Sequence, residues 1–129
     1  MSKLDVVAVA TPFNIRLGLA HQGSAVLLIS VADGNGAPVT GLAQNDFSVK
    51  MLYELTPISA QITNFIDCHI TYPADSLPGE YIVTVTPPNG FWDRVPYSFI
   101  IAVNRGRNRG QSVAVLDLSA LPTSDLQVQ

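Results

Sequence analysis

The tripeptide Asp67-Cys68-His69 is the one place in the sequence where a carboxylate, a nucleophile and a base stand together. Such a group could activate a cysteine nucleophile or contribute ligands to a metal ion. The surrounding alternation predicts a strand, however, and adjacent strand residues point to opposite faces, so Cys68 and His69 cannot readily pair. A zinc site needs three or four ligands, and the other histidine, His21, is distant in sequence. We therefore interpret Cys68 as a small buried side chain, and we predict no catalytic residue and no metal site.

A second group of chemically capable residues is the basic cluster Arg105, Arg107 and Arg109. These are three of the seven Lys and Arg residues of the chain, and they fall within the glycine-rich stretch 104–110. We interpret the stretch as a flexible hairpin loop whose guanidinium groups could converge on phosphate, sulfate or a carboxylate of a partner. The competing interpretation is a solvated loop. Nucleic acid is the least favoured ligand, because the loop has no aromatic side chain on which a base could stack.

The single tryptophan, Trp92, and its neighbour Arg94 lie in or next to a loop that follows residues 87–90. An exposed indole could stack on a sugar ring, together with Tyr97, or could anchor a protein interface. Alternatively, the indole fills the open end of a β-sandwich. The exposure of the indole decides between these interpretations. The candidate ligand- or partner-binding residues are therefore Trp92, Arg94, Arg105, Arg107 and Arg109.

Other familiar site motifs are missing from the sequence. Residues 33–36, Asp-Gly-Asn-Gly, lack the later oxygen ligands and the bidentate glutamate of a calcium loop, and turn chemistry explains them. There is no phosphate-binding loop, dinucleotide fingerprint or nucleophile elbow. We expect no enzyme activity and no cofactor.

Short strands must position these residues, because the dominant hydrophobic periodicity is two. The clearest strand covers residues 24–32, an apolar run typical of a central strand covered on both faces, with Leu27, Ile29 and Val31 buried. A last strand near residues 112–118 has no clear phase, which favours a bulge or an edge strand. The other inward-facing sets are predicted to be Phe13, Ile15, Leu17 and Leu19; Phe47, Val49 and Met51; Ile58, Ala60 and Ile62; Cys68, Ile70 and Tyr72; Tyr81, Val83 and Val85; and Tyr97, Phe99, Ile101 and Val103.

About seven to nine strands with frequent turn signals predict an all-β, immunoglobulin-like β-sandwich of antiparallel strands, with a small closed barrel as the main alternative. Asp75 and the stretch 79–83, Gly-Glu-Tyr-Ile-Val, resemble the turn and tyrosine corner that enter the F strand of immunoglobulin-like domains. The resemblance implies that the Tyr81 hydroxyl bonds to nearby backbone and that Val83 faces the core between the sheets.

A further resemblance lies in residues 29–49, where an Asp-Gly turn leads to Pro38-Val-Thr-Gly-Leu42 and then to Asp46-Phe-Ser-Val49. This pattern, followed by Ile62 and Phe65, is similar to immunoglobulin-like and macroglobulin-like modules of large bacterial proteins. The match covers roughly residues 24–103, and it implies a spacer, a docking surface or a stalk. Such modules usually belong to long multidomain chains. The sequence is therefore compatible both with a fragment of such a chain and with a free subunit.

Composition sets the size and the surface of this domain. A chain of 129 residues predicts one core, with residues 1–121 as a single domain and residues 122–129 as a polar tail or linker. Charged residues make up 13% of the chain, compared with about 25% in typical soluble domains. We therefore expect a neighbouring domain or another copy to cover part of the surface. The net charge of −3 provides no general attraction for nucleic acid or anionic membranes.

The compartment stays open. One cysteine excludes an intrachain disulfide, the N-terminus lacks the features of a signal peptide, and no apolar run reaches the roughly 20 residues of a membrane span. The chain is therefore cytoplasmic as given, or a fragment of an exported protein. The leading functional hypothesis is a non-enzymatic structural or protein-interaction module that acts through loops or edge strands on another protein, a neighbouring domain or itself. The alternative is a carbohydrate- or small-ligand-binding module that uses Trp92, Tyr97 and the 105–109 loop.

Overall fold

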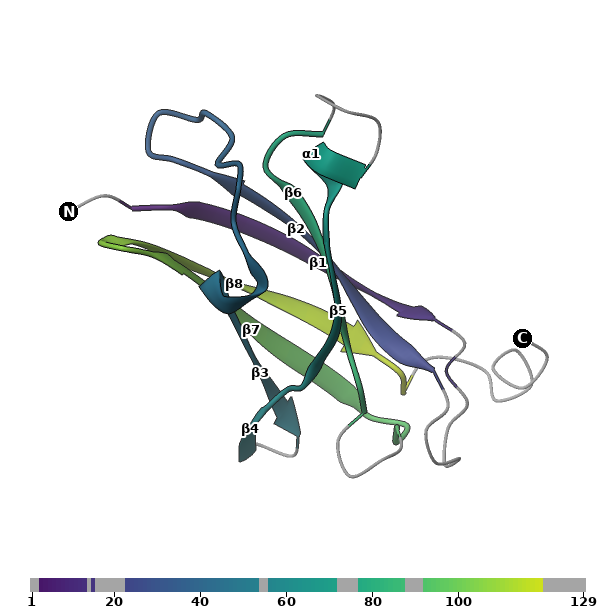
Figure 1. The fold of residues 1–129 in the computed structure, drawn as a ribbon. Helices are drawn as coiled ribbons and strands as arrows, with labels where there is room; N and C mark the ends of the chain where they lie inside the picture. The colour runs from purple at the N-terminus through teal and green to yellow at the C-terminus, as the bar shows by residue number, and fades with distance from the viewer. Residues whose placement is uncertain are drawn as a thin grey trace.

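The computed structural model describes residues 3–13, 15, 23–53, 56–71, 77–87 and 92–119, and it forms an all-β sandwich of two four-stranded antiparallel sheets (Figure 1). Sheet I has the strand order β1-β2-β6-β5, and sheet II has the order β4-β3-β7-β8. The strands are β1 (Asp5–Phe13), β2 (Ser24–Ala32), β3 (Phe47–Tyr53), β4 (Thr56–Ser59), β5 (Ile62–Asp67), β6 (Glu80–Val85), β7 (Pro96–Arg105) and β8 (Asn108–Asp117). A short 3-10 helix, η1 (Gln44–Asp46), precedes β3, and one helical turn, α1 (Cys68–Thr71), follows β5.

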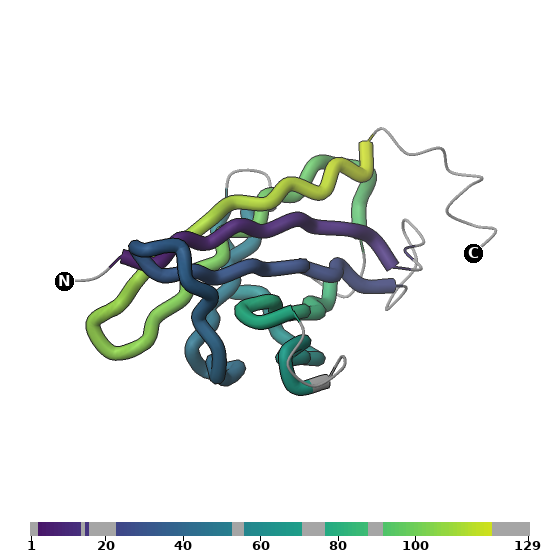
Figure 2. Tube along the Cα trace, turned by 90° about the horizontal axis from the view of Figure 1, so that it is seen from above, coloured from purple at the N-terminus to yellow at the C-terminus, as the bar shows by residue number. Residues whose placement is uncertain are grey.

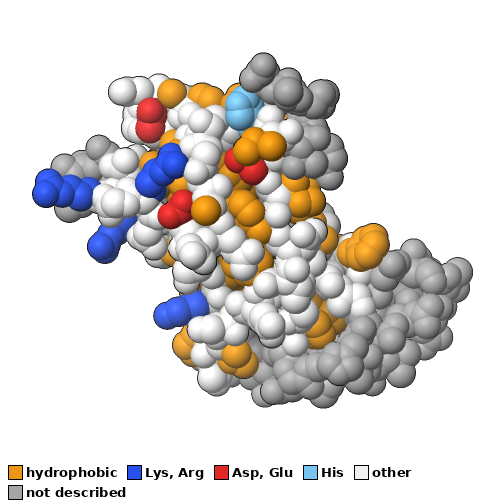
Figure 3. All heavy atoms as spheres, viewed as in Figure 1, with side chains coloured by type: hydrophobic (Ala, Val, Ile, Leu, Met, Phe, Trp, Pro, Cys, Tyr) orange, Lys and Arg blue, Asp and Glu red, His pale blue; other side chains and the backbone are white. Residues whose placement is uncertain are grey.

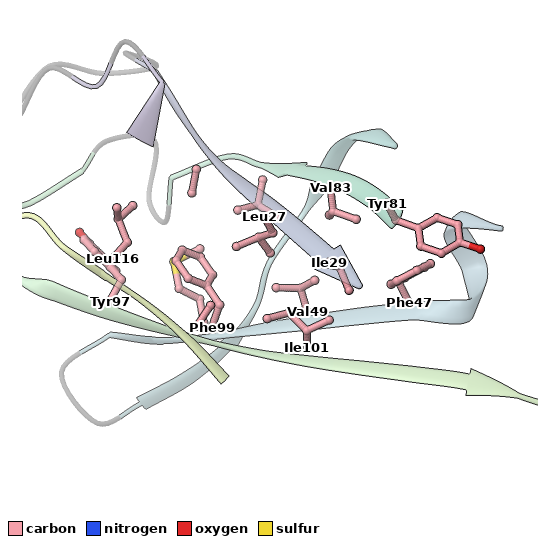
Figure 4. Packing of buried hydrophobic residues seen from close by; sticks show 14 of the residues in the cluster. Leu27, Ile29, Phe47, Val49, Tyr81, Val83, Tyr97, Phe99, Ile101 and Leu116 are labelled. Atoms are coloured by element: carbon pink, nitrogen blue, oxygen red, sulfur yellow. The ribbon is translucent and has the colours of Figure 1, made fainter. Parts of the chain in front are cut away.

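The core between the sheets is built from alternate residues of the strands, as the period-two pattern predicts (Figure 4). The inward sets predicted for β2, β3, β6 and β7 are confirmed, since each of their side chains is at most 6% exposed. The expectation that β2 is covered on both faces is wrong, because Leu28 on its outer face is 45% exposed. Val83 is fully buried between the sheets, in agreement with the tyrosine-corner resemblance.

The first strand lies earlier in the chain than predicted. We expected a strand from Phe13 onward, with Phe13 buried, but β1 ends at Phe13, whose side chain is 60% exposed. Ile15 is buried as expected, whereas Leu17 and Leu19 lie outside the described residues. Pro12 does not break β1 because β1 is the edge strand of sheet I, where a missing backbone donor is tolerated.

The predicted strand through residues 58–62 is divided between the two sheets. Ile58 belongs to β4 in sheet II and Ile62 to β5 in sheet I, and the chain crosses between the sheets at residues 60 and 61. The amide of Ala60 donates to the Val49 carbonyl at 2.9 Å, so this crossing remains tied to β3. Periodicity continues through the crossing because both strands direct alternate side chains toward the same core.

The predicted strand through Cys68, Ile70 and Tyr72 is wrong. Residues 68–71 form the helical turn α1, in which Cys68 is buried and Ile70 is 73% exposed. The carboxylate of Asp67 accepts a hydrogen bond from the His69 amide at 3.1 Å, which favours a turn over a continuing strand. Tyr72 lies outside the described residues.

The last strand, β8, is an edge strand without a bulge. Its pairing with β7 is unbroken from Arg105 opposite Asn108 to Pro96 opposite Asp117. Ala114, Leu116 and Leu118 point inward, and the alternating valines of β8 point outward. The predicted tail, residues 122–129, lies outside the described residues.

The N-terminal segment closes one side of the sandwich, because β1 lies beside β8 and runs parallel to it (Figure 2). The amide of Leu4 donates to the Arg109 carbonyl at 2.8 Å, and Lys3 and Arg109 form a parallel bridge. Within the part of the chain that the structure describes, this is the only backbone hydrogen bond that joins the two segments. The sheets thus meet closely along β1 and β8 without forming a closed barrel.

Tyr81 fixes the chain segment that crosses from β2 to β3. Its hydroxyl donates to the Val39 carbonyl at 2.7 Å and accepts from the Leu42 amide at 3.2 Å. The predicted bond to nearby backbone is therefore wrong, because both partners lie about forty residues earlier in the chain. The reason is that Tyr81 points inward at the end of the sandwich, where this crossing segment passes.

The turn after β2 has the predicted chemistry. The Asp33 carboxylate accepts hydrogen bonds from the amides of Asn35 at 2.8 Å and Ala37 at 3.0 Å, and Gly36 has a φ of 85°. The carboxylate thus stabilises the turn itself. No helix among the described residues is long and apolar enough to cross a membrane.

Candidate functional site

Trp92 lies inside the sandwich and does not form part of its surface. The indole is fully buried, packs edge-on against the Tyr97 ring at 5.0 Å between ring centres, and directs Nε1 toward the Gly23 carbonyl at 3.5 Å. Gly23 precedes β2 and Tyr97 begins the inward row of β7, so the indole fills one end of the core. A sugar ring cannot stack on a buried indole. The geometry thus agrees with the interpretation of Trp92 as an end plug.

The three clustered arginines lie on a tight hairpin and not on a flexible loop. β7 ends at Arg105 and β8 begins at Asn108, so the turn consists of Gly106 and Arg107. Gly106 has a φ of 61°, as the first position of a type II′ hairpin turn requires. Because strand residues alternate in direction, Arg105 and Arg109 occupy opposite faces of the hairpin. The structure therefore does not bring the three guanidinium groups together on one anion.

Arg105 has a structural role. Its guanidinium donates to the carbonyls of Thr40 and Gly41, both at 2.9 Å, and so holds the segment that crosses between the sheets. Arg107 and Arg109 are exposed, as is Arg94 near Trp92. Lys and Arg side chains gather toward the end of the molecule at which the β7–β8 hairpin turns (Figure 3). The basic end is therefore made by Arg107 and Arg109, with Lys3 beside them.

Cys68 has the environment of a buried thiol. Burial, and then the negative charges of Glu80 and Asp67, raise the pKa of the Cys68 thiol above its ordinary value. A raised pKa disfavours the thiolate, which is the nucleophilic form. The neighbouring His69 follows Cys68 in one helical turn and is half-buried.

A shallow depression of about 240 Å³ lies at one end of sheet I and carries two carboxylates, Asp5 and Glu80. The Ser30 hydroxyl donates to Glu80 at 2.6 Å, which occupies one carboxylate oxygen. In the described ranges no group of three or more His, Cys, Asp or Glu side chains is placed to hold a metal ion. Two carboxylates alone provide too few ligands for a calcium or zinc site.

The most unusual surface is formed by the outward side chains of β1 and β8, which we call the β1/β8 face. Val7 and Val9 on β1 are 63% and 55% exposed, and Val113 and Val115 on β8 are 56% and 57% exposed. The bridge between Lys3 and Arg109 sets the parallel register of the two segments. β1 and β8 lie side by side. The outward valines of two segments more than one hundred residues apart therefore expose apolar surface along the same side of the sandwich.

These residues were not identified as a site from the sequence. In the sequence of β8 and the residue that follows it, Val113 and Val115 alternate in the opposite phase to Leu116 and Leu118, so the inner face of the strand is ambiguous. In the structure the larger leucines point inward and the valines point outward. The signal for β1 was weaker, because Val6, Ala8 and Ala10 form its inner face and both faces are therefore apolar.

Comparisons with known proteins provide one structural likeness. No protein-family model matches the sequence, and no curated protein matches it. Among solved structures, the crystal structure of the outer membrane decaheme cytochrome OmcA is similar, with 12% sequence identity and a TM-score of 0.49. The similarity covers 92% of this chain and 23% of that protein, so this chain spans less than a quarter of its length.

Proposed function

We propose that the protein is a non-enzymatic, immunoglobulin-like structural or protein-interaction module that docks through the β1/β8 face. The observation that carries the proposal is that four valines, each at least 55% exposed, stand on two strands that lie side by side. Apolar side chains exposed next to one another on two strands mark interaction surfaces in soluble proteins. The partner is another protein, a neighbouring domain or a second copy.

The strand order supports the immunoglobulin-like part of the proposal. The order β1-β2-β6-β5 corresponds to strands A-B-E-D of immunoglobulin domains, and β3-β7-β8 corresponds to C-F-G. β4 pairs with β3 on the side away from β7, where variable-type domains add a further strand. In this correspondence Tyr81 lies on the E strand, so its role differs from that of the tyrosine corner on strand F.

The buried Trp92 favours docking over the alternative function. Carbohydrate or small-ligand binding would use Trp92, Tyr97 and the arginine hairpin, but both aromatic rings are fully buried. Arg105 is engaged by backbone carbonyls. The exposed Arg94, Arg107 and Arg109 are what remains to support that alternative.

The environment of Cys68 supports the absence of catalysis in the proposal. A buried thiol with a raised pKa is a weak nucleophile at neutral pH. Two further carboxylates, Asp5 and Glu80, lie in a shallow depression that does not exclude water.

Photo-cross-linking in the cells that produce the protein tests the proposal. A benzophenone amino acid replaces Val113 on the β1/β8 face or, as the matched control, Ile70, which is 73% exposed on α1. We expect protein adducts from position 113, identified by mass spectrometry, and none of comparable yield from position 70. Equal yields at the two positions, or no adduct from position 113, would contradict docking through this face.

A further inference from the structure

We propose that the partner of the β1/β8 face is a second copy of the chain, bound face to face about a two-fold axis that passes near Val113. The inference rests on the proposed function and specifies its partner. It follows from the order of the side chains along the outer row of β8.

The outer row of β8 carries opposite charges at its two ends. Its residues are Arg109, Gln111, Val113, Val115 and Asp117, and all five are exposed. The unbroken pairing with β7 leaves this row without a bulge. Arg109 and Asp117 each lie four residues from Val113, which corresponds to about 13 Å along a strand. The row therefore has a basic end, an apolar centre and an acidic end.

This order is self-complementary. A two-fold axis through Val113 reverses the direction of β8 in the second copy, so Arg109 of each copy faces Asp117 of the other. Val113 meets Val113 of the second copy at the centre, Val115 of each copy faces Gln111 of the other, and the two ion pairs lie at the ends. Opposite charges at equal distances from the axis make the row self-complementary, as an isologous interface must be.

The neighbouring strands do not oppose this arrangement. On the N-terminal segment the charged side chains, Lys3 and Asp5, both lie at the beginning, where they offset each other. The outer row of β7 beside β8 is uncharged and consists of Ser98, Ile100, Ala102 and Asn104. Thus no like-charge repulsion arises at the centre of the interface.

Packing through the face also agrees with the position of β1. Direct pairing of two β8 edges would require an open backbone edge, and the Leu4 amide already binds the Arg109 carbonyl at one end of that edge. β1 lies alongside the remainder of β8 (Figure 2). The outer side chains of β8 remain accessible, so sheets can stack at the usual distance of about 10 Å.

The available area indicates a weak, reversible dimer. Three strands, β1, β8 and β7, are about 14 Å wide, and eight residues of β8 span about 27 Å, which gives a projected area of about 400 Å² per copy. Accessible surface exceeds projected area, so the total is near the lower limit of about 1,000 Å² for specific interfaces. We expect a dissociation constant on the order of 10–100 µM.

Sedimentation velocity of purified protein over about two decades of concentration around this range tests the proposal. We expect a reversible monomer–dimer equilibrium for the wild-type chain. Arg109→Asp and Asp117→Arg each replace both ion pairs by like-charge contacts, and each should raise the dissociation constant about tenfold or more. The double variant Arg109→Asp/Asp117→Arg restores opposite charges and should return the constant to within about threefold of the wild-type value.

Controls separate the interface from folding. Lys50→Glu reverses a charge on the exposed face of β3, outside this row, and should leave the equilibrium unchanged. Circular dichroism confirms that each variant is folded. A wild-type chain that stays monomeric throughout, or a double variant as weak as the single variants, would overturn the proposal. In the first case, adducts from position 113 with a different protein would leave the proposed function intact.

Discussion

Replacing Tyr81 by phenylalanine tests how the sandwich holds the segment between β2 and β3. The hydroxyl makes two hydrogen bonds, to the Val39 carbonyl at 2.7 Å and from the Leu42 amide at 3.2 Å. The substitution keeps the ring and its contact with Phe47, whose ring centre lies 5.2 Å away. It therefore removes polar contacts without creating a cavity.

The expected loss follows from burial. Tyr81 is 1% exposed and Leu42 is 3% exposed, so water cannot replace the missing partner. Each lost hydrogen bond costs about 1 kcal/mol, and an unsatisfied buried amide costs about 1–3 kcal/mol. The free energy of unfolding should fall by about 2–4 kcal/mol, a large share of the roughly 5–15 kcal/mol of a typical domain.

Urea unfolding measures this loss as a lower transition midpoint at unchanged slope. Hydrogen exchange provides the local control, because the Leu42 amide should exchange faster in the variant while amides of β7 keep their relative protection. A loss below about 1 kcal/mol, or a Leu42 amide as protected as in the wild type, would refute this reasoning.

The same residue predicts a pH dependence. Burial is the main cause that raises the pKa of the Tyr81 hydroxyl above its ordinary value near 10, although the hydrogen bond from Leu42 acts in the opposite direction. The folded protein then keeps the proton to higher pH than the unfolded chain. Stability is complete below about pH 10 and is lost as the pH rises through the folded pKa. Tyr81→Phe should lose less stability than the wild type as the pH rises above about 10. The raised pKa of Cys68 contributes equally to both proteins and does not affect the comparison.

Two further substitutions test the contacts that close the sandwich. Gly110→Ala places a methyl group against the backbone carbonyl that precedes β1 and should cost about 1–3 kcal/mol in urea unfolding, whereas Gly34→Ala, with no atom nearer than 3.9 Å, should be near neutral. Equal stabilities of the two variants would contradict the close approach. Arg105→Ala removes two hydrogen bonds to residues 40–41 and should cost about 1 kcal/mol, whereas Arg107→Ala should stay within about 0.5 kcal/mol of the wild type. An Arg105 variant as stable as the Arg107 variant would contradict the structural role of Arg105.

Much of the core could be predicted because large apolar side chains recur with period two. In β7 the inward positions carry large residues such as Tyr97 and Phe99, and three of the four outward positions from Ser98 to Asn104 are small or polar, with Ile100 as the exception. In β1 the inward positions carry Val6, Ala8 and Ala10 and the outward positions carry Val7 and Val9, so hydrophobicity alone does not identify the inner face. Periodicity also says nothing about which sheet a strand joins, which is why residues 58–62 read as one strand.

The candidate site was harder to predict because it depends on contacts between distant segments. The strands that carry Val7 and Val113 lie side by side in the fold although they are more than one hundred residues apart in the sequence, and the bond from the Leu4 amide to the Arg109 carbonyl joins them at one end. The basic cluster was visible in the sequence, but the tight turn at Gly106 directs its members apart. The burial of Trp92 likewise depends on how β2 and β7 meet at the end of the core.

Chemical cross-linking tests the central claim, docking of the β1/β8 face on a second copy, most directly. Val113→Cys in a Cys68→Ala background places one thiol near the proposed two-fold axis, and Ile70→Cys in the same background is the control. Backbones of stacked sheets lie about 10 Å apart, so a short bismaleimide can join two thiols at position 113. We predict a covalent dimer from position 113 that Arg109→Asp suppresses, and little dimer from position 70. No covalent dimer from position 113, or equal dimer from both positions, would contradict the account.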